Sequence, residues 1–181
     1  MAVKTVKTTK QTRKKLPEKR RLSLTVNGQA FELETGTESH QVDPAHTLAH
    51  TLRETLGFTG TKVSCDHGAC GCCTVLMDGK ATLSCMTLTV ECDGKKITTI
   101  EGLIDPKTGK MDPLQQAFID HGAFQCGFCT PGIIMSAKAL LSQNPFPTEG
   151  EVKEGLSGNF CRCISHYQVV KAVMAASREA R

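Results

Sequence analysis

Ten cysteines in a chain of 181 residues are the feature of this sequence with the clearest chemical meaning. Eight of them form two groups of four: Cys65, Cys70, Cys73 and Cys85, and then Cys126, Cys129, Cys161 and Cys163. Thiolates ligate metals, and in a reducing compartment closely spaced cysteines indicate metal binding or redox chemistry more often than disulfides. The sequence therefore predicts a metalloprotein with two centres.

The first group has the spacing Cys65-x4-Cys70-x2-Cys73, followed by Cys85. This is the plant-type arrangement of thiolates around a 2Fe–2S cluster. Gly68 and Gly71 lie in the same loop, and glycine permits the positive φ angles that turn main-chain N–H groups toward an anion. We therefore expect this loop to wrap a 2Fe–2S cluster, with the fourth thiolate supplied by a strand beyond a hairpin.

Three other residues close to this group could in principle ligate metal, and we expect that none does. Using Cys72 would break the spacing, and a buried free cysteine such as Cys72 or Cys92 behaves as a small hydrophobic residue. His67 lies inside the loop, but a Rieske centre needs two histidines in place of two cysteines. We interpret His67 as an exposed loop residue.

The second group consists of Cys126-x2-Cys129 and Cys161-x-Cys163, pairs too close in sequence for an easy internal disulfide. Cys129 directly precedes Thr130-Pro131, which is typical of a helix start, so the helix dipole would stabilise its thiolate. From the residues alone, this group suits a structural zinc ion as well as a second 2Fe–2S cluster. The first group favours the cluster.

The residues before position 104 indicate a sheet with one helix. Alternating apolar and polar residues flank Asn27-Gly28, which predicts a hairpin over 22–33, and further strands are expected at 74–77 and 97–100. Leucines at every fourth position predict a helix over 44–56. Asp43 can cap that helix, Pro44 suits its first position and Gly57 can end it.

The later residues indicate helices throughout. Helix starts are expected at Asp112-Pro113, at Thr130-Pro131, at the capping box from Thr148 to Glu151, and at Ser165. The predicted class is therefore α+β, with a ferredoxin-like sheet domain at 21–103, a linker at 104–111 and a helical domain at 112–181.

The net charge of +4 comes from a basic arm at residues 1–20, which precedes a slightly acidic body. We expect this arm to be disordered or to dock a partner. No aromatic residues are interleaved for base stacking, so we expect no nucleic-acid partner. We also expect no membrane span, and a cytoplasmic location unless a partner that carries an export signal takes the chain to the periplasm.

Five stretches, in this order, carry a resemblance to one known family: residues 52–62 (LRETLGFTGTK), 65–75 (CDHGACGCCTV), 98–103 (TTIEGL), 125–132 (QCGFCTPG) and 158–163 (GNFCRC). The chain resembles the small iron–sulfur subunit of the molybdenum hydroxylases, the family of xanthine oxidase, aldehyde oxidoreductase and carbon monoxide dehydrogenase. Two departures concern Cys72, where the family has a small residue such as alanine, and residues 164–167, where a Thr-Gly-Tyr sequence is usual. We expect His166 in this segment to be a plain helix-start residue.

The resemblance implies a β-grasp domain followed by a four-helix domain, each with one 2Fe–2S cluster. It implies an oxidoreductase subunit whose partners are a large molybdopterin-binding subunit, which carries out the substrate chemistry, and a medium FAD-binding subunit. Electrons would pass from molybdenum through the helical domain's cluster to the ferredoxin-like cluster, and then to flavin or an external acceptor. Gln125 and Cys163 would touch the pterin.

Two other functions stay open on the sequence. One is a zinc-stabilised binding module whose basic arm contacts nucleic acid, and the other is a standalone two-cluster ferredoxin.

Overall fold

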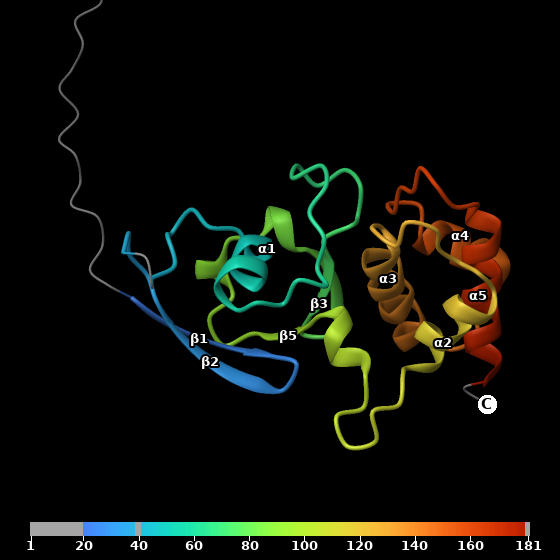
Figure 1. The fold of residues 1–181 in the computed structure, drawn as a ribbon, viewed down its shortest axis with the longest axis horizontal. Coiled ribbons are helices and arrows are strands. Elements are labelled where there is room, and N and C mark those ends of the chain that lie inside the picture. Colours follow the sequence, from blue (N-terminus) through green and yellow to red (C-terminus); the bar gives the residue numbers. More distant parts are fainter. Residues whose placement is uncertain (1–19, 39–40, 180–181) are drawn as a thin grey trace, which may run out of the picture.

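The computed structural model describes residues 20–38 and 41–179, so the predicted basic arm, apart from Arg20, lies outside the described residues. Residues 21–103, the sheet half, and residues 112–179, the helical half, lie next to each other (Figure 1). The connection 104–111 runs along the lower side of that view, whereas the loops that carry cysteines stand at the upper side. The predicted α+β class is confirmed.

The sheet has five strands in the order β2-β1-β5-β3-β4, of which β1 and β5 are parallel and the other neighbours antiparallel. The strands are β1 (Arg21–Val26), β2 (Gln29–Glu34), β3 (Thr74–Met77), β4 (Lys80–Leu83) and β5 (Lys96–Thr98). Asn27-Gly28 and Asp78-Gly79 form the two hairpin turns with positive φ at all four residues. Both predicted turns are confirmed, because this geometry is the one that Asn-Gly and Asp-Gly pairs favour.

The strand expected at 97–100 ends two residues earlier, and side-chain hydrogen bonds explain why. The side chain of Asn27 accepts from Thr99 N at 2.9 Å and donates to Thr99 Oγ1 at 2.9 Å. Thr99 is therefore bonded to a side chain and not to a neighbouring strand. The 3₁₀ helix η4 (Ile100–Leu103) follows immediately.

The helix expected over 44–56 begins later than predicted. Asp43 Oδ1 accepts from Ala45 N at 2.8 Å in a local turn, and Thr47 is the N-cap that accepts from His50 N at 3.3 Å. Such a local turn is a common alternative for aspartate, which made the sequence signal ambiguous. The observed elements are α1 (Leu48–His50) and a π-helical turn, η1 (Thr51–Thr55).

Four helices build the second half, as predicted: α2 (Pro113–Asp120), α3 (Thr130–Gln143), α4 (Glu149–Gly155) and α5 (His166–Glu179). Asp112 caps α2 by accepting from Leu114 N at 3.0 Å. The Thr148 hydroxyl accepts from Glu151 N at 3.3 Å, which confirms the capping box of α4. Among the described helices, none has the length and apolar character needed to cross a membrane.

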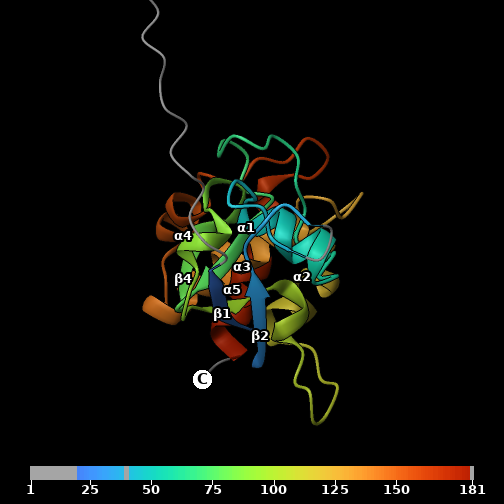
Figure 2. The same cartoon turned by 90° about the vertical axis from the view of Figure 1, so that its left-hand side faces the viewer.

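Strand β3 joins the cores of the two halves because its successive side chains point to opposite faces. Val75 is buried with Leu48 and Leu52 of the sheet half. Leu76 is instead buried with Met135 and Ala139 of α3. Figure 2, viewed from the side of the sheet half, shows the sheet in front of α3 and α5.

Main-chain atoms also meet between the halves. A Cβ atom at Gly132 of α3 would overlap the main-chain oxygen of Gly71 and lie 2.8 Å from Cys72 Cα. Asn159, which is 4% exposed, donates from Nδ2 to Gly71 O at 3.2 Å, and Phe160 N donates to Cys70 O at 3.0 Å. We call these contacts, between residues 70–72 on one side and Gly132, Asn159 and Phe160 on the other, the seam.

Gly132→Ala tests the seam. The added methyl group meets main-chain atoms, which cannot rotate away, so we expect the free energy of unfolding to fall by about 1–3 kcal/mol in a denaturant titration. Gly150→Ala in α4 is the control, because its added Cβ would meet only Thr148 Oγ1, at 3.9 Å. That control should be neutral or stabilising by up to about 1 kcal/mol. Equal stability of the two variants would contradict a close-packed seam.

Candidate metal centres

The first cysteine group is carried by the loop before β3 and by a 3₁₀ turn after β4. Cys65 and Cys70 are partly exposed, whereas Cys73 and Cys85 are 3% and 5% exposed. Cys85 lies on η2 (Ser84–Met86) and not on a strand, which corrects the prediction. Ser84 Oγ donates to Cys73 O at 2.7 Å. This bond fixes the 3₁₀ turn and holds Cys85 close to Cys73.

The side chains of the first group act on one another in two pairs. The pKa of Cys65 is lowered mainly by the main chain of His67 and further by the Cys70 side chain, and the pKa of Cys85 is raised mainly by burial and further by the Cys73 side chain. A two-iron cluster with four cysteine ligands binds two thiolates at each iron. The pairing therefore fits a 2Fe–2S cluster.

Main-chain N–H groups point at the sulfur of Cys65. Hydrogen bonds from the main chain, the largest from His67, lower the pKa of Cys65 to about 6, and the one from Ala69 N measures 3.3 Å. Gly68 and Gly71 have φ of +79° and +73°, as the sequence predicted. The loop thus favours negative charge where a thiolate cluster would place it.

The second group also forms two pairs, each with one cysteine from the loop before α3 and one from the loop before α5. Cys126 Sγ and Cys163 Sγ are 3.6 Å apart and both residues are exposed. Cys129 is buried; burial raises its pKa, and the neighbouring Cys161 side chain raises it further. The predicted position of Cys129 at the start of α3 is confirmed, since it is the N-cap.

The surroundings of the second group contain further donors. Cys161 Sγ accepts from Cys163 N at 3.4 Å and from Ile164 N at 3.3 Å. Across the described residues, no three His, Cys, Asp or Glu side chains gather as they would around a single metal ion. The second group shares with the first a sulfur atom that accepts hydrogen bonds from main-chain N–H groups.

Burial acts against ionisation of the inner thiols. Loss of water raises the pKa of both Cys85 and Cys129 to about 12. A cation at either site removes this cost, because metal ligation requires the thiolate and stabilises it. The inner positions are therefore suited to metal-bound sulfur.

The other residues singled out in the sequence lie as follows. Gln125 is exposed beside the exposed pair of Cys126 and Cys163. His67 is exposed, and its Nδ1 is 2.5 Å from Cys65 O. His166 is the first residue of α5, as expected.

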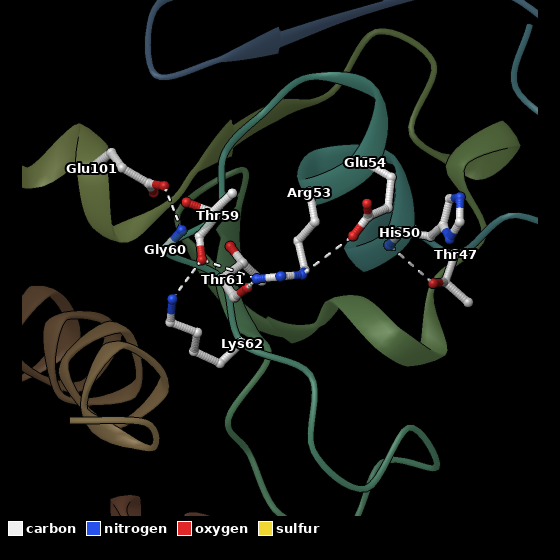
Figure 3. A network of polar contacts seen from close by, with 9 residues as sticks. All are labelled: Thr47, His50, Arg53, Glu54, Thr59, Gly60, Thr61, Lys62 and Glu101. Carbon is white, nitrogen blue, oxygen red and sulfur yellow. Dashed lines mark hydrogen bonds and ion pairs between the residues drawn. The ribbon is translucent and has the colours of Figure 1, made fainter. Parts of the chain in front are cut away.

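Some residues that shape these loops lie in stretches that carry the family resemblance, but the sequence predicted no individual role for them. Figure 3 shows Arg53, whose Nη1 atom donates to Thr59 O at 3.0 Å and to Thr61 O at 2.8 Å. Glu101 Oε1 accepts from Gly60 N at 2.7 Å in the same network. These bonds order the segment that leads to Cys65. Asn159 was noticed only as part of the stretch 158–163, and its buried bond to Gly71 could not be foreseen.

Comparison with known protein families gives two overlapping matches. Residues 11–119 match the 2Fe-2S iron-sulfur cluster binding domain, and residues 99–174 match the [2Fe-2S] binding domain. Each match contains one complete group of four cysteines.

Similar proteins include small subunits of oxidoreductases. The nicotine 6-hydroxylase small subunit of Paenarthrobacter nicotinovorans is 53% identical over 135 residues, which cover 75% of this chain and 80% of that one. The nicotinate dehydrogenase small FeS subunit of Eubacterium barkeri is 41% identical over 155 residues, covering 86% and 93%. Quinoline 2-oxidoreductase from Pseudomonas putida 86 has a solved chain with a TM-score of 0.81 and 40% identity, covering 91% of this chain and 97% of that one.

Substitution of single ligands tests the two groups separately. Cys73→Ser should remove the first centre and about half of the bound iron, because serine is a poorer ligand for iron than thiolate, and Cys126→Ser should remove the second. Cys92→Ser is the control, since Cys92 lies among the apolar residues of the sheet half. Iron analysis and EPR spectra of the reduced protein are the measurements. Loss of iron from Cys92→Ser to the same extent would contradict these assignments.

Proposed function

Because the chain belongs to the small 2Fe–2S iron–sulfur subunits of the molybdenum hydroxylase family, we propose that it relays electrons through two 2Fe–2S clusters. The donor is the molybdopterin centre of a large partner subunit, and the acceptor is a medium FAD-binding subunit or an external carrier. The chain is a subunit of an oxidoreductase, and substrate chemistry takes place on its partner. We place the complex in the cytoplasm, where ligand thiols stay reduced.

The eight paired cysteines are the proposed ligands. Cys65 with Cys70 and Cys73 with Cys85 hold one cluster, and the second is held by the other two pairs, Cys126 with Cys163 and Cys129 with Cys161. A bound 2Fe–2S cluster supplies a carrier of one electron. The chain's own part is to fix the pairs, direct N–H groups at the sulfur atoms and control their exposure to water.

The observation that carries the proposal is the seam. Phe160 precedes the ligand Cys161, and its N–H donates to the main-chain oxygen of the ligand Cys70 at 3.0 Å. One hydrogen bond and a few covalent bonds therefore join the ligand sets of the two sites. Electron transfer needs such proximity, whereas two independent structural metal sites would not.

Exposure suggests where electrons enter and leave. At the second site the pair Cys126 and Cys163 is exposed together with Gln125, so we propose that the molybdopterin-binding partner docks there. The pair Cys129 and Cys161 faces inward toward the seam. At the first site the exposed residues include Asp66, His67, Ala69 and Met86, which we assign to the acceptor side.

Metal analysis of the complex tests the relay. We expect about four irons and four acid-labile sulfides per chain, a brown colour and two distinct EPR signals after reduction. Copurification of a large molybdenum-containing subunit should accompany them. A colourless protein with stoichiometric zinc would overturn the relay and support a zinc-stabilised binding module. Two clusters without any molybdenum partner would indicate a standalone ferredoxin instead.

Asn159→Ala tests the seam as an electron path. The change removes one of the donors to the buried oxygen of Gly71, which keeps its bonds from Thr74 N and Thr74 Oγ1. Loss of this one hydrogen bond costs about 0.5–1.5 kcal/mol and loosens the contact between the ligand sets. We expect both clusters to stay bound, and the transfer of electrons between them to become slower in rapid-mixing experiments on the complex. Asn144→Ala is the control, because Asn144 bonds the exposed Glu151 at 3.2 Å. Equal transfer rates in both variants would argue against this path.

A further inference from the structure

Two cysteines belong to neither group of ligands, and their surroundings differ. Cys92 is 0% exposed and its Sγ donates to Leu88 O at 3.5 Å, within the core of the sheet half. Cys72 is 4% exposed and lies in the loop of the first site, yet it is buried in the core of the helical half. Cys72 therefore belongs to the sheet half by sequence, but its thiol is buried in the core of the helical half.

Adjacent residues in this loop point in different directions. Cys73 is buried with Cys85 and Ala49, which belong to the sheet half. Cys72 is buried with Cys129 and Ile133 at the start of α3. Gly132 of the same helix lies against the main chain of Cys72. The side chain of Cys72 is thus directed away from Cys73 and Cys85 of the first site and toward the second site.

The thiol of Cys72 has a ligand of each proposed site close to it. Cys72 and Cys129 are buried in one core cluster, and Cys70 packs against that cluster. Burial raises the pKa of Cys72, and the Cys70 side chain raises it further. Cys70 is bound to iron as a thiolate in the proposed function, so in a hydrogen bond between these two side chains Cys70 accepts and Cys72 donates. The thiol therefore lies between the two ligand sets, on the inner side of both.

We propose that Cys72 tunes the electron relay: its S–H group donates a hydrogen bond to the Cys70 thiolate and raises the reduction potential of the first cluster relative to the second. This inference rests on the proposed function. A hydrogen bond to a ligand sulfur stabilises the reduced cluster more than the oxidised one, because the reduced cluster places more negative charge on its sulfur atoms. Cys72 is a positioning residue here, since it acts through Cys70.

The test is an EPR-monitored redox titration of the complete complex with Cys72→Ala, Cys72→Ser and Cys92→Ala. Cys72→Ala removes the donor, so the first cluster should become harder to reduce. We expect the ratio of reduced first cluster to reduced second cluster to fall about threefold, which corresponds to about 28 mV at 59 mV per tenfold for one electron. Cys72→Ser keeps an O–H donor and should lie closer to the parent protein. Cys92→Ala should change neither potential.

Each other outcome counts against the inference. Unchanged potentials in Cys72→Ala would overturn it while both EPR signals still supported the relay. The same shift in Cys72→Ser as in Cys72→Ala would show that the donor is not the cause, and the same shift in Cys92→Ala would point to a general effect of core packing. Loss of the first signal in Cys72→Ser would identify Cys72 as a ligand. Absence of both signals from the parent protein would overturn the proposed function itself.

Discussion

Main-chain contact between the two halves is the constraint on which this structure depends. Residues 70–72 approach Gly132 so closely that no Cβ atom fits there, and a Cβ at Gly71 would lie 2.5 Å from Asn159 Nδ2. Two hydrogen bonds to the oxygens of Cys70 and Gly71 fix the same approach. Because main-chain atoms cannot change rotamer, the distance between the two cysteine groups is set by the backbone itself. The connection 104–111, on the opposite side of Figure 1, has no part in it.

Burial of sulfur links folding to ligation. The core of the helical half contains Cys72 and Cys129 among its apolar side chains, and aromatic residues make up only 4% of the chain. The buried thiol of Cys129 resists ionisation, so the fold without a cation favours its neutral form. The free energy of metal binding is then also folding free energy, as in other small domains whose ligands come together only in the native state. A chain stabilised in this way needs only a small apolar core.

Local signals in the sequence predicted most of the elements, and contacts between distant residues account for what was missed. The turns at Asn27-Gly28 and Asp78-Gly79 and the cap at Thr148 depend on residues within a few positions of each other, so they could be read directly. The late start of α1 and the position of Cys85 on a 3₁₀ turn depend on competing local bonds and on Ser84. Asn159 and Gly71 are 88 positions apart, and the residues next to each of them in the sequence do not predict the hydrogen bond.

The spacing of the first cysteine group predicted that Cys73 and not Cys72 is a ligand, and the chain direction supplies a physical reason. Cys72 and Cys73 are the central residues of a turn that Thr74 N closes by donating to Gly71 O at 3.3 Å, and their side chains leave this turn in different directions. Cys73 is buried with Cys85, and its main-chain oxygen accepts from Ser84 Oγ beside Cys85. Cys72 is thereby directed toward α3 and the second group. The seam at Gly132 holds Cys72 against α3, which leaves Cys73 as the proposed ligand.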